Sequence, residues 1–169
     1  MSPLVVFVGP PGAGKSTVAD DVAARLGVTV RDTDRDIEAN EGVSVQDIFI
    51  DHGEAHFRAL EEKAVAAALA EHEGVLALGG GAILSPVTRA ALADARVVFL
   101  DVGLSAAVSR VGMNSGRPLL LGNVRSQMKN LMDQRRPLYQ ECASFTIVTD
   151  ELTAAQVAEQ ALALIGADA

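Results

Sequence analysis

One stretch decides the fold of this 169-residue chain: Gly9-Pro10-Pro11-Gly12-Ala13-Gly14-Lys15-Ser16. It fits the phosphate-binding loop pattern G-x-x-x-x-G-K-[ST]. An apolar run of strand character, Leu4–Val8, precedes it, and a helical pattern over 16–26 follows it directly. The motif requires this setting of strand, loop and helix. A Gly-Pro turn that precedes Lys and Ser by chance is the alternative, and it has no need of such a setting. The sequence therefore predicts a site for a nucleoside triphosphate.

The residue types of this loop suit phosphate chemistry. Its glycines let the backbone bend so that successive N–H groups point at phosphate oxygens, and the following helix N-terminus adds partial positive charge. Lys15 can reach the outer phosphates, and Ser16 carries a hydroxyl expected to bind Mg²⁺. We expect the nucleotide contacts of the loop to come from Gly12, Ala13, Gly14, Lys15, Ser16 and Thr17.

Strand-like and helix-like segments alternate along the rest of the chain. Short Val- and Leu-rich runs, expected to be strands covered on both faces, occupy Leu4–Val8, Val28–Asp32, Val75–Leu78, Val97–Asp101 and Ser144–Val148. Helical patterns occupy 16–26, 54–72, 86–93, 104–111, 124–141 and 153–165. This alternation predicts an α/β fold, in which a parallel sheet lies between two layers of helices.

Two stretches interrupt the alternation within what the length predicts to be a single domain, 1–169. The first, about 32–61, carries charged residues and two phenylalanines. The second, about 112–124, includes the Gly/Ser/Asn segment Gly112–Pro118, which is typical of a mobile loop. We expect a substrate-binding insertion at 32–61 and a lid at 112–124, because insertions beside a phosphate loop commonly carry these two functions.

The composition limits the partners and the compartment. The formal net charge of −8 argues against general binding to nucleic acid or to a membrane surface, since both are polyanions. The single cysteine, Cys142, cannot form an internal disulfide, and we expect it to be a small buried residue in a reducing cytosol. We find no signal-peptide pattern and no apolar run of membrane-spanning length. We therefore expect a cytoplasmic protein that acts as a monomer.

Two aspartates follow the second predicted strand, in Asp32-Thr33-Asp34. Ligands of open α/β sheets lie beyond the carboxyl ends of the strands, so one carboxylate could hold Mg²⁺ while the other accepts a hydroxyl proton. The alternative is that Thr33 or Asp34 merely caps a helix over 35–40. Asp101, which ends an apolar strand, is a second and weaker candidate for the metal.

Three successive glycines, Gly79-Gly80-Gly81, follow the third predicted strand. Such a run has a high entropic cost, which suggests that side chains are excluded there for a reason. We favour close approach of a substrate to free backbone N–H groups. A tight turn or close packing of a helix against the strand is the alternative.

Arginines are the other candidates for an anion site. Arg58 is expected on a helix with Glu54, Glu61 and Glu62 within reach, where the alternative is a solvated ion-pair face. Arg117 is expected in the mobile loop, from which it could reach the phosphates. A local cationic cluster is needed because the chain as a whole is acidic.

Taken together, the motifs of this chain resemble those of the shikimate kinases. They are the phosphate loop, Asp32-Thr33-Asp34, Gly53-Glu54 before Phe57-Arg58 and Glu61, Gly79-Gly80-Gly81, Arg117-Pro118-Leu119-Leu120 and Arg135-Arg136-Pro137-Leu138-Tyr139. Their order and spacing match over essentially the whole chain. The resemblance implies a five-stranded parallel sheet in the order 2-3-1-4-5. It also implies ATP- and Mg²⁺-dependent phosphorylation of the 3-hydroxyl of shikimate, a step towards chorismate and the aromatic amino acids.

The same resemblance implies roles for the residues that would bind shikimate. Asp34 would bind the ring hydroxyls and act as the base. Arg58 and Arg135 would grip the carboxylate, helped by the backbone of Gly79-Gly80-Gly81. We choose Arg135 over Arg136 because the R-x-P-L-Y spacing selects it.

Further roles follow from the resemblance at the nucleotide end. Lys15 and Arg117 would stabilise charge on the transferring phosphoryl group. Ser16 would bind Mg²⁺ directly and Asp32 through water, while Arg110 would stack on adenine.

Two phenylalanines, Phe49 and Phe57, would form walls around the shikimate ring. One region departs from the family pattern, because Ile147-Val148-Thr149-Asp150 stands where many members have Val-Asp-Thr, and the later proline is missing. Contacts to the adenine from this region, and a preference for ATP over GTP, are therefore left open.

Overall fold

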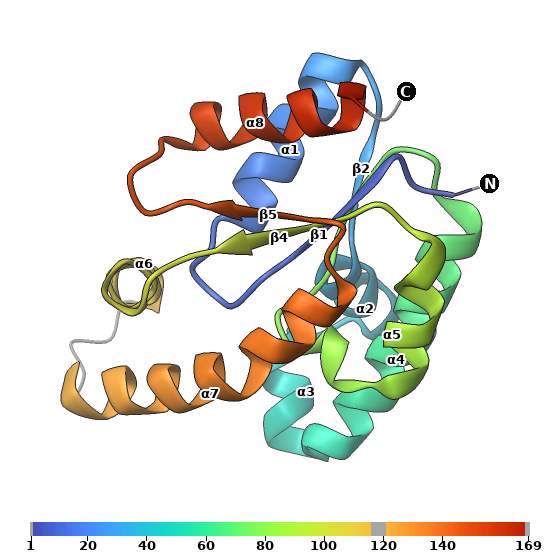
Figure 1. The fold of residues 1–169 in the computed structure, drawn as a ribbon. Helices are drawn as coiled ribbons and strands as arrows, with labels where there is room; N and C mark the ends of the chain where they lie inside the picture. Colours follow the sequence, from blue (N-terminus) through green and yellow to red (C-terminus); the bar gives the residue numbers. More distant parts are fainter. Residues whose placement is uncertain (1, 116–120, 168–169) are drawn as a thin grey trace.

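Five short apolar segments form one parallel sheet in the order β2-β3-β1-β4-β5 (Figure 1). The structure, a computed structural model, describes residues 2–115 and 121–167, without the side chains of 111–115, 121–124 and 167. The strands are β1 (Val5–Val8), β2 (Val30–Asp32), β3 (Val75–Ala77), β4 (Val97–Asp101) and β5 (Phe145–Val148). The predicted strand order is confirmed.

Helices cover both faces of the sheet. They are α1 (Lys15–Leu26), α2 (Thr33–Glu41), α3 (Val45–His52), α4 (Glu54–Glu71), α5 (Pro86–Ala91), α6 (Leu104–Ser115), α7 (Leu121–Cys142) and α8 (Ala154–Ala167). Short 3₁₀ turns at Ala82–Leu84 and Leu92–Asp94 flank α5. Helices α1 and α8 lie on one face of the sheet, and α4, α5 and the C-terminal half of α7 lie on the other (Figure 1).

The alternating side chains of each strand divide between two hydrophobic clusters. Phe7 and Leu100 point into the cluster formed with α1 and α8. Val8 and Phe99 point into the opposite cluster, which α4, the two 3₁₀ turns and Tyr139 of α7 complete. Because both faces of the sheet are buried, the positions of the strand ends relative to one another are fixed.

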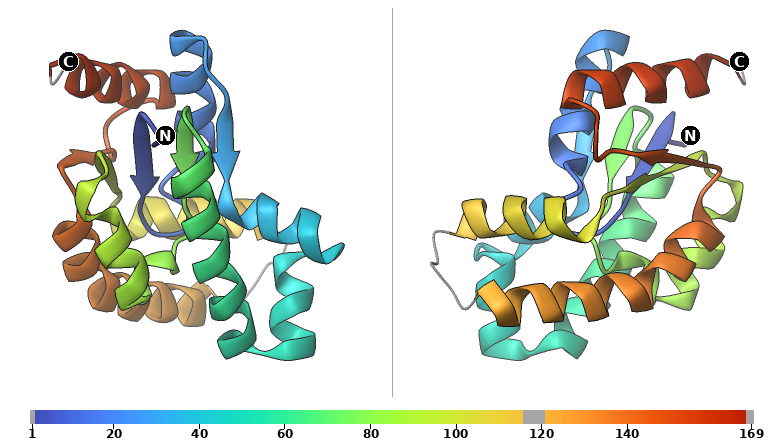
Figure 2. Two further views of the ribbon diagram at one scale, coloured as in Figure 1. Left: turned by 90° about the vertical axis from the view of Figure 1, so that its right-hand side faces the viewer. Right: turned by 60° about the vertical axis from the view of Figure 1, so that its left-hand side comes forward.

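The insertion at 32–61 is more regular than the sequence suggests. It folds into α2, α3 and the start of α4, and α2 and α3 project from the body of the protein beside α4 (Figure 2). Helix α2 includes the 35–40 segment, for which the sequence offers a helix only as an alternative, but its N-cap is neither Thr33 nor Asp34. Asp32 caps it instead, because its carboxylate accepts hydrogen bonds from the N–H groups of Asp34 and Arg35.

The Gly/Ser/Asn segment also differs from expectation. Gly112–Ser115 continues α6, where the sequence predicts a loop, and the last part of the predicted lid, 121–124, begins α7. The central residues 116–120, including Arg117, lie outside the described residues, so the lid remains a prediction. In the described part of the chain, no helix is both long and apolar enough to cross a membrane.

Candidate active site

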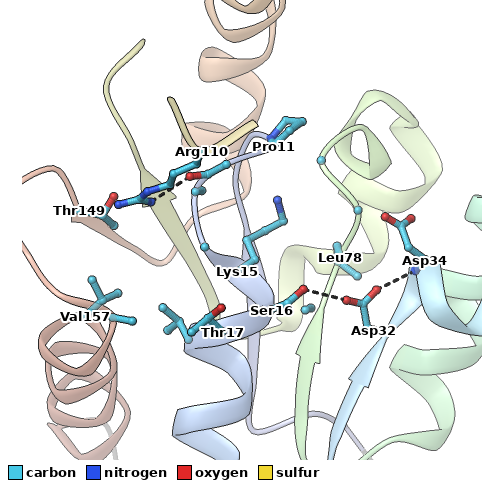
Figure 3. A pocket seen from close by; sticks show the side chains of 18 of the residues that line it. Pro11, Lys15, Ser16, Thr17, Asp32, Asp34, Leu78, Arg110, Thr149 and Val157 are labelled. Carbon is cyan, nitrogen blue, oxygen red and sulfur yellow. Dashed lines mark hydrogen bonds between the residues drawn. The ribbon is translucent and has the colours of Figure 1, made fainter. Parts of the chain in front are cut away.

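A cleft of about 590 Å³ opens where β1 and β3 end. Figure 3 shows Lys15 in its centre, with Arg110 towards one end and Asp34 towards the other. The residues that line it come from the phosphate loop, from the ends of β2 and β3, from α6 and from the segment after β5: Pro11–Val18, Asp32, Asp34, Ala77–Gly80, Arg110, Thr149, Leu152, Ala154 and Val157. The loop residues predicted to contact nucleotide, Gly12 to Thr17, all line this cleft.

The phosphate loop is held by its own lysine. Lys15 Nζ donates hydrogen bonds to the carbonyl oxygens of Gly9 at 2.7 Å and Pro10 at 3.1 Å. Gly14 adopts φ +84° at the start of α1, a conformation that favours glycine. Burial lowers the pKa of Lys15 to about 8, although the charges of Asp34 and Asp32 oppose this change. The ammonium group therefore lies in a desolvated position where an anion would stabilise its charge.

Ser16 and Asp32 form an oxygen-rich pair beside the loop. Ser16 Oγ donates a hydrogen bond to Asp32 Oδ2 at 3.2 Å, while Asp32 Oδ1 caps α2 (Figure 3). Hydroxyl and carboxylate oxygens are hard ligands of the kind that Mg²⁺ prefers, so the two side chains fit the metal that the sequence assigns to them. Asp101 does not share this place, because its carboxylate accepts a hydrogen bond from Arg136 Nη1 at 2.8 Å.

Asp34 is a half-buried carboxylate at the other end of the cleft, and its Oδ1 atom is buried. Its Oδ1 makes no hydrogen bond with any residue in the described part of the chain. Burial, and then the negative charges of Asp32 and Glu61, raise the pKa of Asp34 to about 6, against the opposing charge of Lys15. A carboxylate with a raised pKa and a free oxygen is suited to accept a proton near neutral pH.

Arg58 lies beside two aromatic rings and is paired with carboxylates. Its Nη1 donates to Glu61 Oε1 at 2.7 Å and its Nη2 to Glu54 at 3.4 Å. The side chain of Glu61 is only 4% exposed, so the ion pair is not the solvated face considered as the alternative. Glu62 is not part of it.

Phe49 and Phe57 meet each other with ring centroids 4.6 Å apart, beneath this guanidinium. The Cζ atom of Arg58 lies 5.8 Å from the Phe49 centroid and 5.3 Å from the Phe57 centroid. The aromatic pair and the buried Glu61 together hold the guanidinium in one direction.

Each of the three glycines makes room for a neighbouring group. A Cβ at Gly79 would lie 2.6 Å from Asp34 Oδ1, and a Cβ at Gly81 would lie 2.6 Å from Arg58 Cζ. A Cβ at Gly80 would lie 3.0 Å from the ring of Pro11 in the phosphate loop. The expected free N–H groups are not found at Gly79, whose N–H donates to the Thr33 hydroxyl at 3.2 Å.

Arg135 and Arg136, which the sequence left hard to separate, point to different places. Burial lowers the pKa of Lys15 and raises that of Glu61, and the positive charge of Arg135 acts to lower both, so its guanidinium lies on the side of the helix that faces the site. It also faces Tyr139, whose pKa burial raises to about 12 while Arg135 opposes the rise. Arg136 is bonded to Asp101 instead.

The end of the cleft nearest Arg110 contains two residues that the sequence analysis did not identify, Leu152 and Val157. Arg110 Nη1 donates to the carbonyl oxygen of Gly12 at 2.9 Å, so its guanidinium lies over the loop. Leu152 and Val157 line the same end, beside Thr149, whose buried Oγ1 has no hydrogen-bond partner in the described part of the chain. The only signal in the sequence was their place just after the last strand.

A model of the shikimate kinase family matches residues 11–166. A shikimate kinase from Salinispora arenicola is 56% identical over 167 residues, covering 99% of this chain and all of the relative. One from Streptomyces coelicolor is 53% identical and covers 95% of this chain and 94% of the relative.

This chain belongs to the shikimate kinase family. A solved shikimate kinase from Acinetobacter baumannii, in complex with shikimate, superposes with a TM-score of 0.91 at 34% identity, covering 99% of this chain and 94% of that one. Shikimate kinases use ATP with Mg²⁺ as the phosphoryl donor. The cleft of this chain therefore has to hold two substrates, and Lys15 lies between the two ends.

Proposed function

We propose that this chain transfers the γ-phosphoryl group of ATP to the 3-hydroxyl of shikimate, and that Asp34 accepts the hydroxyl proton. The hydroxyl oxygen forms a bond to the γ-phosphorus as the bond from that phosphorus to the bridging oxygen breaks, which gives ADP and shikimate 3-phosphate. The observation that carries this proposal is the position of Asp34, a half-buried carboxylate with a raised pKa in the cleft that contains the phosphate-loop lysine. Family membership supports the same reaction.

The substrate end of the site suits a carboxylated ring. Arg58 and Arg135 supply planar cations that can each make two parallel hydrogen bonds to a carboxylate. Phe49 and Phe57 offer an apolar wall below Arg58, and the backbone of Gly80 and Gly81 lies beside it. The insertion at 32–61 thereby acts as the shikimate-binding part of a single domain.

The nucleotide end suits a triphosphate. Lys15 would move from the loop carbonyls to the outer phosphates, and Arg117 would join it from the predicted lid at 112–124. Ser16 would hold Mg²⁺ directly and Asp32 through water; the ion neutralises phosphate charge during transfer. Arg110 would stack on the adenine.

We also propose that the enzyme works as a cytoplasmic monomer that binds neither nucleic acid nor membranes. The net charge of −8 supports the absence of nucleic-acid and membrane binding, because a polyanion would be repelled overall. Sedimentation at micromolar concentration would test the monomer, and a dimer would contradict it.

The reaction is tested by measuring ADP release from ATP·Mg²⁺ with shikimate, gluconate, AMP and no acceptor in parallel. We expect rapid ADP release with shikimate alone. Turnover with gluconate or AMP but not with shikimate would overturn the assignment. An Asp34→Asn variant should lose a factor of about 10²–10⁴ in kcat while remaining folded, the usual contribution of a general base. Near-normal turnover of that variant would exclude Asp34 as the base.

Arg58→Lys tests the carboxylate grip separately. We expect a large rise in the KM for shikimate with the KM for ATP nearly unchanged, because an ammonium group cannot make the two parallel bonds. An unchanged KM for shikimate would remove Arg58 from the site.

A further inference from the structure

Two side chains that the sequence brought forward have no part in the reaction described above. Asp101 ends β4, and Arg136 lies in α7 next to Arg135. Arg136 Nη1 donates to Asp101 Oδ2 at 2.8 Å, and the Asp101 side chain is only 16% exposed. Partial burial strengthens such a pair relative to an ion pair at the surface.

Asp101 is a rigid point of attachment. It pairs with Val148 in the sheet register of β4 and β5, and its carbonyl oxygen accepts a hydrogen bond from Thr149 N–H at 2.9 Å. The strand itself lies between β1, which leads into the phosphate loop, and β5. A group bonded to Asp101 is thereby fixed relative to the phosphate loop.

Helix α7 needs such a point because its backbone is interrupted nearby. Pro137 stands inside the helix and has no N–H to donate to the carbonyl of Asp133, which weakens the helix around Arg135. One contact beyond the proline, from the Tyr139 hydroxyl to the carbonyl oxygen of Gly80, attaches α7 to the end of β3. The buried Tyr139 ring also stacks on Phe99, with centroids 5.0 Å apart. Both Tyr139 contacts lie on the C-terminal side of Pro137, whereas Arg135 lies before it.

The Arg136–Asp101 pair adds a contact to a different strand, on the side of Pro137 that carries Arg135. Successive residues of an α-helix are about 100° apart around the axis, so Arg136 points about 100° away from Arg135, whereas Tyr139, three residues further on, lies only about 60° from Arg136. Contacts to two different strand ends, Gly80 after β3 and Asp101 on β4, hold the helix on both sides of Pro137. The backbone from which the Arg135 side chain extends is held with them.

We propose that the Arg136–Asp101 ion pair is a positioning device that sets Arg135 for the shikimate carboxylate. The proposal rests on the role of Arg135 given under the proposed function. Arg136 does not touch the substrate, and it acts through the helix that carries Arg135. It also assigns Asp101, which resembles a metal ligand in sequence, to the positioning of Arg135 instead of to the binding of Mg²⁺.

The test compares Arg136→Ala, Asp101→Ala and the double variant. For each, we expect the KM and the calorimetric Kd for shikimate to rise by about threefold to tenfold, the range of a partly buried ion pair, with kcat and the KM for ATP within about twofold of wild type. The double variant should bind shikimate no worse than the worse single variant, because both remove the same contact. Arg136→Lys should restore much of the affinity, because only one nitrogen of Arg136 contacts Asp101.

A matched control lies on the same helix. Lys129→Gln removes the exposed i,i+4 pair with Asp133, at 2.6 Å, and should leave shikimate binding unchanged. If Lys129→Gln raises the KM for shikimate as much as Arg136→Ala does, the effect is general loss of helix stability, and the proposal is wrong. Unchanged shikimate affinity in Arg136→Ala, or additive losses in the double variant, would also overturn it.

The wild-type enzyme tests the proposed function independently of the positioning proposal. If wild-type protein does not phosphorylate shikimate, the reaction assignment fails before any variant is made. If wild type is active and Arg135→Ala leaves the KM for shikimate unchanged, the role of Arg135 is refuted, and the positioning proposal with it. If Arg135→Ala raises the KM and Arg136→Ala does not, only the positioning proposal fails.

Discussion

A methyl group added at Gly79 tests whether Asp34, the proposed base, depends on the shape of the strand end. In a Gly79→Ala variant the new Cβ would lie 2.6 Å from Asp34 Oδ1 and 3.0 Å from Glu61 Oε2, where ordinary contact begins near 3.4 Å. Asp34 would therefore have to move its oxygen by about 0.8 Å. The backbone of Gly79 does not require a positive φ, so the effect comes from this contact and not from backbone strain.

The size of the effect follows from the displacement. A misplacement of about 1 Å in a reacting group can cost on the order of 10²-fold in rate, so we expect Gly79→Ala to lower kcat by roughly 10- to 100-fold. The KM for ATP should change little, because Gly79 faces Asp34 and Glu61 and not the phosphate loop. The crowding should also lower the free energy of unfolding by about 1–3 kcal/mol, as overpacking does.

The assay is steady-state ADP release at saturating ATP·Mg²⁺, with thermal unfolding measured on the same samples. Gly166→Ala in α8 is the matched control, because nothing lies within 4 Å of its Cβ. The control should keep normal kinetics and gain about 0.5–1 kcal/mol from better helix propensity. A Gly79→Ala enzyme with wild-type kcat would show that Asp34 can move freely, and would refute the reasoning that the strand end holds the base.

Four more outcomes are expected. Gly81→Ala should raise the KM for shikimate by about tenfold or more with a smaller effect on kcat, because its Cβ would displace Arg58. Steady-state kinetics in which kcat falls by as large a factor as KM rises would contradict this. The value of kcat/KM for shikimate should fall as the pH drops below about 6, the raised pKa of Asp34, because this carboxyl must be ionised to accept a proton. A fall that begins only near pH 4 would argue against Asp34. The same raised pKa means that the folded state favours protonated Asp34, so its contribution to the free energy of unfolding is greatest at pH below about 4 and is lost as the pH rises through 6. Asp32→Ala should raise the Mg²⁺ concentration needed for half-maximal activity, whereas Asp101→Ala should not; the opposite result would return the metal to Asp101.

Much of the fold could be predicted from the sequence because its signals are local. The phosphate loop and the apolar runs fix where β1 and the other strands lie, and the boundaries differ from prediction by only a few residues. Helix α2 was foreseen only as an alternative, over 35–40, and α3 was missed. Both sequences mix charged and apolar residues without a strong period, and α3 spans only Val45–His52. Tertiary contacts with α4 supply what the local sequence lacks.

Less of the site could be predicted, because its contacts join residues far apart in sequence. Local spacing showed that Arg58 and Glu61 could meet on one helix, but not that Glu61 would be buried. It could not show that Arg136 would meet Asp101, 35 residues away. The burial of Thr149 could not be predicted for the same reason, since its position depends on the pairing of β5 with β4.

The glycine run shows how a correct inference can have a different physical cause. The sequence implied that side chains are excluded at Gly79-Gly80-Gly81, and a substrate was the expected reason. In the structure, much of the space next to these residues is occupied by Asp34, Glu61, Pro11 and Arg58 of the protein itself. The end of β3 therefore sets the spacing between Asp34, Arg58 and the phosphate loop. Because the backbone at this strand end sets the spacing, Asp34 and Arg58, the proposed base and the proposed carboxylate-binding group, need little rearrangement when shikimate enters. Such preorganisation is a large source of rate in phosphoryl transfer.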